Sequence, residues 1–260
     1  MTESETGDAR DNPLLRPESL PLRPASAALA FGRTCVVAPH PDDESLACGG
    51  AITLLRRAGI PVFVLFISDG TGSHPSSRLY PQERLRDLRE AEARAALACL
   101  NVPETLSAFL RLRDTAVPGE GEAGFHDAVA RCREHLVAFA PETVLLPWRR
   151  DYHCDHRATW EIVQAAIAAN GDGPVRPHLV EYPVWVYDHL LEGYAPRPGE
   201  MTAWRLDIAD AMARKQAAVQ CHRSQYTDLI ADDLEGFRLL PEVLARFARP
   251  WEVYLEEPHD

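Results

Sequence analysis

Two patterns of apolar residues alternate along the chain and predict its secondary structure. Short, continuous apolar runs are typical of strands that are covered on both faces of a parallel sheet, and apolar residues spaced three or four apart are typical of helices. The predicted strands are residues 34–38, 61–67, 106–112, 143–147, 178–187 and 251–255, and the predicted helices are 44–58, 81–100, 125–139, 156–169 and 209–226. In the second of these helices, the expected buried stripe consists of Leu85, Leu88, Ala91, Ala95 and Ala98.

This alternation indicates an α/β fold. Strands and helices of these lengths imply right-handed crossovers and a Rossmann-like, doubly wound, mostly parallel sheet with helices on both faces. We expect a single domain over residues 31–260, because no internal repeat and no clear linker interrupts it. Residues 1–30 are rich in Pro, Ser and charge, so we expect a flexible N-terminal tail that can lie over the body.

Composition narrows the classes of partner. The formal net charge of -12 disfavours nucleic acid and anionic membrane surfaces, which are bound by clustered Lys and Arg. No apolar run approaches the roughly 20 residues that span a bilayer, and the acidic N-terminus has no apolar segment typical of a signal peptide. The six cysteines include no C-x-x-C pair, which is typical of reduced thiols. We therefore expect a cytoplasmic protein without integral membrane association; a homo-oligomer is left open.

Polar segments follow four of the predicted strands. His40–Glu44 follows the first, Ser68–Gly70 the second, Arg113–Asp114 the third and Trp148–His156 the fourth. In doubly wound sheets, ligands bind beyond the carboxyl ends of the strands. These four segments are therefore expected to meet at one edge of the sheet and to form a site.

The first segment, PHPDDE, contains more acids than a helix start needs. Pro41 suits the first turn of a helix, and the helix dipole favours Asp42 and Asp43 there. That interpretation requires one capping carboxylate, however, and gives no role to His40.

The second segment, HCDH, changes the balance between these interpretations. His153, Asp155 and His156 stand between a predicted strand and a predicted helix, in the same topological position as the first segment. A polar first turn capped by Asp155, with both histidines facing solvent, is the simpler explanation of this segment alone. Two such segments at equivalent strand ends favour a metal site.

The residue types suit a catalytic zinc ion, or another divalent transition metal, with one ion per chain. Catalytic zinc keeps three protein ligands and one open position, and His40, Asp43 and His156 can supply the three. Asp42 would then remain free as a general base, although dividing these roles between Asp42 and Asp43 depends on the resemblance given below.

Two further polar residues of HCDH would assist. His153 could stay unligated and stabilise a developing oxyanion as a donor. Asp155 could hold an imidazole in one tautomer.

Together, APHPDDES and HCDH resemble the PIG-L/LmbE-like family of zinc-dependent N-acetylglucosamine deacetylases. The resemblance extends from about residue 33 onward and includes SDG after the second strand and an R-x-x-E element in the long helix. It implies that His40, Asp43 and His156 bind zinc, that Asp42 is the general base and that His153 assists the oxyanion or the leaving group.

The resemblance also implies that Arg89 and Asp114 bind polar groups of the substrate. An exposed helix arginine paired with Glu90 or Glu92, and a turn-forming aspartate, are equal alternatives. His222, in QCHRSQY, is more simply a core or surface histidine than a site residue.

The sequence therefore predicts a metal-dependent N-deacetylase, a hydrolase that removes an N-acetyl or short N-acyl group from a small amino-sugar conjugate. Alternatives are an amidase of a thiol–sugar conjugate, a phosphoester hydrolase, or a non-catalytic carbohydrate-binding module that contains a metal. A two-metal phosphoesterase would need more ligands, and a structural site would not need a free Asp42. A nucleotide-binding protein is disfavoured because PHPDDE stands where G-x-G-x-x-G would be expected.

Overall fold

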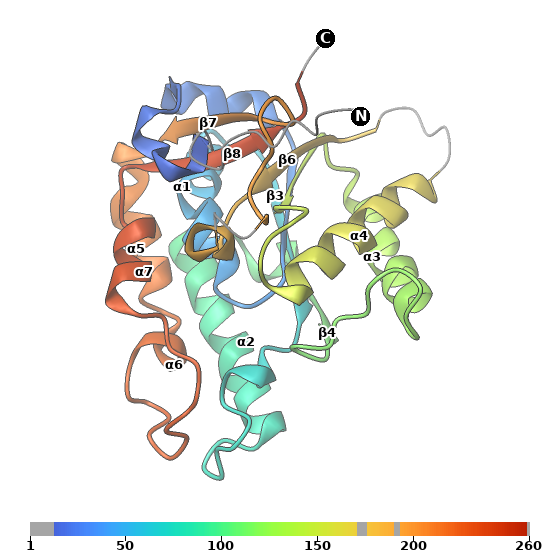
Figure 1. Ribbon diagram of the computed structural model, residues 1–260, viewed down its shortest axis with the longest axis vertical. Coiled ribbons are helices and arrows are strands. Elements are labelled where there is room, and N and C mark those ends of the chain that lie inside the picture. Colours follow the sequence, from blue (N-terminus) through green and yellow to red (C-terminus); the bar gives the residue numbers. More distant parts are fainter. Residues whose placement is uncertain (1–12, 171–175, 190–192, 259–260) are drawn as a thin grey trace, which may run out of the picture.

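A computed structural model describes residues 13–170, 176–189 and 193–258 and shows an eight-stranded sheet with helices on both faces (Figure 1). The strands are β1 (Leu22–Arg23), β2 (Thr34–Ala38), β3 (Val62–Ser68), β4 (Ser107–Leu112), β5 (Thr143–Pro147), β6 (His178–Tyr182), β7 (Thr202–Asp207) and β8 (Trp251–Glu256). The α-helices are α1 (Asp43–Arg57), α2 (Gln82–Cys99), α3 (Phe125–Phe139), α4 (Cys154–Ala168), α5 (Met212–Val219), α6 (Arg223–Tyr226) and α7 (Pro241–Phe247).

The sheet is mixed but mostly parallel, in the order β1-β7-β8-β6-β5-β2-β3-β4. Strands β6, β5, β2, β3 and β4 pair in parallel, whereas β8 is antiparallel to both β6 and β7. The predicted α/β class is therefore confirmed. Strands β1 and β7 were not predicted from the sequence.

The chain reverses its direction of travel across the sheet between β2 and β5. From β2 it continues through β3 and β4 to one edge, and it then returns to β5 and β6 on the other side of β2. In an open α/β sheet, such a switch point leaves a crevice at the carboxyl ends of the two strands. The HPDD and HCDH segments follow β2 and β5, so both lie at this crevice.

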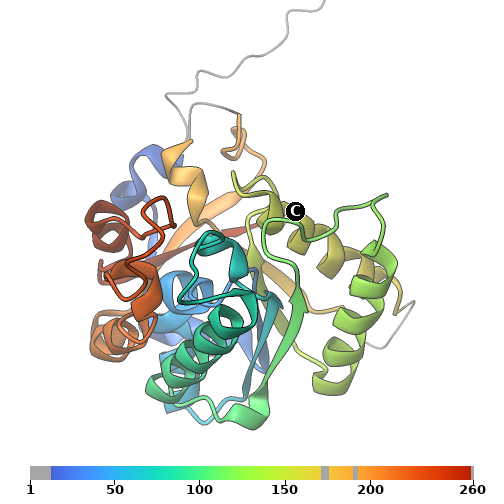
Figure 2. The same ribbon diagram turned by 90° about the horizontal axis from the view of Figure 1, so that it is seen from below.

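Alternate residues of the central strands fill two separate cores. Val36 and Ala38 belong to the core beneath α1 and α2, whereas Cys35 and Val37 belong to the core beneath α3 and α4. Both views show these two pairs of helices on opposite sides of the sheet, with α5 on the side of α1 (Figures 1 and 2). Burial on both faces explains the continuous apolar runs in the sequence.

The buried side of α2 differs from the predicted stripe. Leu85 is buried as expected, but Ala91, Ala95 and Ala98 are exposed and Leu88 is only partly buried. The buried residues of the helix are instead Leu85, Arg89, Glu90, Glu92, Ala93, Ala96 and Leu97. Arg89 and Glu92 are charged but have buried hydrogen-bond partners. A prediction from hydrophobicity alone therefore placed the buried stripe on the wrong side of the helix.

Two predicted elements are shorter than expected. The strand predicted over 178–187 ends at Tyr182, where Pro183 follows, and continues as the 3₁₀ helix η7 (Trp185–Asp188). The helix predicted over 209–226 is divided into a 3₁₀ turn, α5 and α6. Near this division, His222 and Ser224 bond to acids on α1 and α2, which fixes α6 in its own orientation.

The described part of the N-terminal segment is packed against the domain, where the sequence led us to expect a flexible tail. Leu14 and Leu20 are buried in a cluster with Trp148 and Val186, and β1 pairs with β7. The 3₁₀ helix η4 (Ala25–Phe31) then leads into β2. Residues 1–12 lie outside the described residues. Within the described residues, no helix has the length and apolar character needed to cross a bilayer.

Candidate metal centre and active site

Three titratable side chains meet where β2 and β5 end. The Oδ2 atom of Asp43, the first residue of α1, lies 3.3 Å from His40 Nδ1 and 3.2 Å from His156 Nε2. Ring nitrogens of His40, His153 and His156 lie within 4.8 Å of one another. The structure thus brings together the three predicted ligands, with the third histidine beside them.

The surroundings of His156 suit a metal ligand. Its side chain is 0% exposed, and neither ring nitrogen has a hydrogen-bond partner of acceptable geometry among the described residues. A buried polar atom left unpaired costs free energy, and coordination would remove that cost. Burial opposes ionisation of Asp43, but His156 and His40 hold its pKa well below the usual range. Two imidazoles and one carboxylate form a donor set that fits zinc.

Two carboxylates contact the Nε2 atom of His40, on the opposite side of the ring from Asp43. Its Nε2 atom lies 3.1 Å from Asp155 Oδ2 and 3.1 Å from Asp114 Oδ1. Asp155 also accepts backbone N–H bonds from Thr115 at 2.7 Å and from Val117 at 3.2 Å. In a neutral His40 ring, these acceptors would favour the proton on Nε2 and would leave the Nδ1 lone pair available on the side of Asp43. Asp155 has the geometry expected of a residue that orients an imidazole.

Asp42 has different partners from its neighbour Asp43. Its Oδ2 atom lies 3.1 Å from an Nη atom of Arg89, and its φ of 143° is one that L residues rarely adopt. Burial raises the pKa of Asp42 to about 7, with Arg89 acting in the opposite direction. Strained backbone of this kind is concentrated at functional sites.

Arg89 is a buried residue of the site. Its guanidinium donates to the carbonyl of Gly70 at 2.9 Å and to that of Pro41 at 2.6 Å. The alternative of an exposed arginine paired with Glu90 or Glu92 is wrong, because Arg89 is only 3% exposed and pairs with Asp42.

Asp114 contacts protein groups on both of its oxygens. Besides the contact with His40, its Oδ2 atom accepts the backbone N–H of Gly72 at 2.8 Å. The predicted contact with substrate remains a prediction, and the structure adds a role in fixing His40.

His153 is the N-terminal cap of α4. Its Nδ1 atom accepts the backbone N–H of Asp155 at 3.2 Å. Burial, together with the nearby His40, lowers the pKa of His153 to about 3. A neutral ring that accepts at Nδ1 carries its proton on Nε2 and can donate there.

His222 has the structural role that its sequence context favoured. It is buried, and its Nε2 atom lies 3.0 Å from Glu44 Oε1 and 3.3 Å from Ser45 Oγ, which tie α6 to the start of α1. Glu44 in turn accepts the backbone N–H of Asp42 at 2.9 Å, so this pair also fixes the turn that carries the site.

A cavity of about 300 Å³ opens onto the candidate metal site. Sequence reasoning missed several of its lining residues, because single aromatic residues and a glutamine carry no distinctive spacing. Only Tyr152 could have been suspected from the sequence, because it directly precedes His153. The residues that line the cavity are His40, Asp42, Asp43, Gly72, Ser73, Arg89, Asp114, Thr115, Tyr152, His153, Trp185, His189, Gln225 and Phe237.

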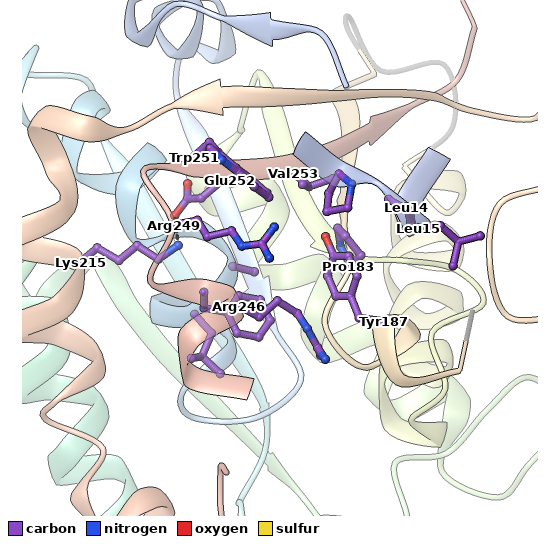
Figure 3. A pocket seen from close by; sticks show the side chains of 14 residues that line it. Leu14, Leu15, Pro183, Tyr187, Lys215, Arg246, Arg249, Trp251, Glu252 and Val253 are labelled. Atoms are coloured by element: carbon purple, nitrogen blue, oxygen red, sulfur yellow. Dashed lines mark hydrogen bonds and ion pairs between the residues drawn. The ribbon is translucent and has the colours of Figure 1, made fainter. Parts of the chain in front are cut away.

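A second pocket shares none of these residues. Figure 3 shows its lining, which includes Tyr187, Arg246, Arg249 and Trp251, with the buried pair Lys215–Glu252 at 2.8 Å. Arg246 is paired with Asp188 there. The candidate ligands and Asp42 are absent from this pocket, so the chemistry belongs to the first cavity.

Comparison with known proteins agrees with this geometry. A family model described as PIG-L, GlcNAc-PI de-N-acetylase, matches residues 35–167, more than half of the chain and including both motif segments. This chain belongs to the PIG-L family. The predicted class of enzyme, a hydrolase that deacetylates N-acetylglucosamine-type conjugates, is confirmed at the level of that family.

Individual relatives cover most of the chain. The 1D-myo-inositol 2-acetamido-2-deoxy-alpha-D-glucopyranoside deacetylase of Gordonia bronchialis is 26% identical over 238 residues, covering 74% of this chain and 83% of the relative. A probable N-acetyl-alpha-D-glucosaminyl L-malate deacetylase 2 of Bacillus anthracis is 24% identical, covering 76% and 83%. The solved N,N'-diacetylchitobiose deacetylase from Pyrococcus horikoshii shares the fold, with a TM-score of 0.61, 23% identity and coverage of 99% and 95%.

Proposed function

We propose that this PIG-L family member is a zinc-dependent hydrolase that removes an N-acetyl or short N-acyl group from an N-acetylglucosamine-type conjugate. His40, Asp43 and His156 would hold one zinc ion per chain. The observation that carries the proposal is the buried His156. Neither of its ring nitrogens makes a hydrogen bond of acceptable geometry with the described residues, and its Nε2 atom lies beside Asp43 Oδ2, which also contacts His40.

Asp42 would act as the general base. A bound zinc ion would supply a water of lowered pKa and would polarise the acyl carbonyl. Asp42 would accept the proton of the attacking water, and Arg89 would hold the Asp42 carboxylate toward the cavity. The 3.1 Å contact between these two side chains supports this division of roles between Asp42 and Asp43.

His153 would stabilise negative charge on the acyl oxygen. Its Nδ1 atom is occupied by the Asp155 amide, so Nε2 would donate to the oxygen as charge develops. The amine would then leave with a proton returned by Asp42 or donated by His153. Asp155 and Asp114 would keep the His40 ring in one orientation throughout.

Metal content and acetate release, measured on wild type and on Asp42→Asn, test the proposal. We expect about one zinc per chain in both proteins and loss of at least about a hundredfold in kcat for the variant, because general-base catalysis contributes factors of this size. Asp87→Asn, at an exposed aspartate of α2, is the matched control and should retain wild-type activity.

The same assay separates this function from its alternatives. Zinc binding without acetate release from any of a broad panel of N-acetylglucosamine conjugates would favour a binding module. An Asp42→Asn variant that keeps full activity would disprove the general-base role. Failure of wild type to bind any divalent transition metal would disprove the metal site.

A further inference from the structure

The cavity beside the metal centre has a polar side and an aromatic rim. Asp42, Arg89 and Asp114 are charged groups on the polar side, and their contacts with protein groups are given above. Tyr152, Trp185 and Phe237 come from three separate segments of the chain and also line the cavity. Gln225, on α6, contributes a further polar group to the same cavity.

Gln225 has an acceptor that the protein does not use. The side chain is fully buried, and its Oε1 atom has no hydrogen-bond partner among the described residues. Its Nε2 atom donates to Ser224 Oγ at 2.8 Å, while Ser224 donates to Glu92 on α2 at 2.6 Å through its hydroxyl and at 2.8 Å through its backbone N–H. The amide is thus held firmly beside the cavity, and its buried, unpaired oxygen is the acceptor that we assign to a hydroxyl or N–H of a ligand there.

The aromatic rim is partly exposed and well anchored, with Trp185 half-buried against the hydrophobic core. Phe237 is 37% exposed and packs edge-to-face against Trp185, with 5.6 Å between ring centroids and 86° between planes. The backbone N–H of Phe237 donates to Ser73 at 2.6 Å, and that of Trp185 donates to Asp151 Oδ2 at 3.0 Å.

Tyr152 adds a second aromatic surface to this rim. It is 44% exposed, and its ring stacks on that of His189 with 3.4 Å between centroids. Large aromatic groups kept near solvent at the mouth of a cavity are typical of binding surfaces.

We propose that Gln225 and the Trp185–Phe237 pair form a subsite for the part of the substrate that lies beyond the acylated nitrogen. Gln225 accepts a hydrogen bond from a sugar hydroxyl, and the Trp185–Phe237 pair packs against an aglycone that presents a flat apolar face. This assignment rests on the proposed function, because the acyl group must lie at the metal for the aglycone to reach the rim. A volume of about 300 Å³ is at the lower end for ligand pockets, so a single amino sugar nearly fills it.

The chemistry of such an aglycone follows from the rim. An aromatic ring can stack on Trp185 or meet Phe237 edge-on, whereas a methyl group offers too little surface for either contact. The preferred substrates are therefore amino sugars with an aromatic group on the anomeric oxygen.

Binding of deacetylated products tests the subsite without turnover. Calorimetric titration of the zinc-loaded full chain would compare the phenyl and methyl glycosides of glucosamine. We expect the phenyl glycoside to bind about three- to tenfold more tightly to wild type, as stacking energies of aromatic pairs suggest. Trp185→Ala and Phe237→Ala should each reduce this preference to less than about twofold, and Gln225→Ala should weaken both glycosides equally, by about fivefold.

Matched controls separate these effects from damage to the fold. Leu240→Ala changes an exposed apolar residue after the same loop as Phe237, and Gln216→Ala changes an exposed glutamine on α5; neither lines the cavity. Both should bind like wild type. Trp185→Phe keeps an aromatic ring at the rim and should therefore retain the phenyl preference. If Trp185 had only a structural role, this preference would not depend on an aromatic ring at position 185.

The outcomes distinguish the subsite from the reaction. Equal binding of the two glycosides to wild type, or a preference that survives Trp185→Ala and Phe237→Ala, would overturn the subsite. Acetate release from N-acetylated methyl and phenyl glycosides is measured alongside. If wild type released no acetate yet preferred the phenyl product through Trp185 and Phe237, the subsite would stand and the proposed reaction would fail.

Discussion

Asp42 and Asp43 are adjacent in the chain but have opposite electrostatic surroundings. Asp43 lies between two imidazoles, which favour its ionised form, whereas burial raises the pKa of Asp42 to about 7. Asp42 has a positive φ, and its side chain pairs with Arg89 instead of with the imidazoles. Two identical residue types therefore acquire different chemistry from their different partners.

Gly70 leaves room for the guanidinium of Arg89 because it has no Cβ. It has a φ of +69°, and a Cβ added there would lie 2.7 Å from an Nη atom of Arg89. We expect Gly70→Ala to cost about 2–3 kcal/mol in the free energy of unfolding and to lower kcat, because both the backbone and the guanidinium must shift.

Gly59→Ala is the matched control, because Gly59 has a φ of +76° but no atom within 4 Å of an added Cβ. It should cost about 1 kcal/mol and leave kcat unchanged. Urea unfolding and initial rates on both variants measure the difference. Equal losses of kcat would show that the position of Arg89 is unimportant.

At the scale of elements, the loops after the parallel strands hold the site and are themselves fixed by ion pairs. Arg150, three residues before His153, pairs with Glu200 through both terminal guanidinium nitrogens and donates to the carbonyl of Ala195 at 3.0 Å. This pair connects the loop after β5 to the segment that precedes β7.

The Arg150–Glu200 pair predicts a pH dependence of stability. Bonding to Arg150 lowers the pKa of Glu200 to about 2. A lowered pKa stabilises the fold when pH exceeds the unfolded value of about 4.3, and this contribution disappears as pH falls toward 2. Glu200→Gln should therefore lower Tm at pH 7, and the gap from wild type should close between about pH 4.5 and 2.

Thermal unfolding followed by circular dichroism across this pH range tests the pair. Glu120→Gln, at an exposed glutamate, should follow the wild-type curve at every pH. A Tm gap for Glu200→Gln that is constant from pH 7 to pH 2 would show that charge on Glu200 does not stabilise the loop.

Sequence patterns predicted the elements, and which residues come together at the candidate metal site, more completely than the rest of the cavity lining. The strands of the parallel core are continuous apolar runs, and HPDD and HCDH are dense motifs at equivalent strand ends, so both kinds of signal are local. Arg89 is different: its role depends on α2 burying charged residues, which inverts the usual pattern. Gln225 and Phe237 reach the cavity only through the tertiary fold, and no spacing in the sequence records that.

For the whole molecule, the described N-terminal segment forms part of the domain. Leu14 is 1% exposed and packs in a cluster with Trp148 and Val186, near the loop that leads from β5 to the site. Leu15, the next residue, is 37% exposed. Both are leucines in the same 3₁₀ turn, so they offer a direct comparison of buried and exposed positions.

Leu14→Ala should destabilise the domain by about 2–4 kcal/mol, because it removes buried methyl groups and leaves a cavity in the cluster that contains Trp148. Leu15→Ala should cost less than about 1 kcal/mol. Equilibrium urea unfolding followed by tryptophan fluorescence measures both values. If the two variants were equally stable, the segment would contribute little to the domain; a large difference with a single cooperative transition would show that it unfolds together with the sheet that carries the site.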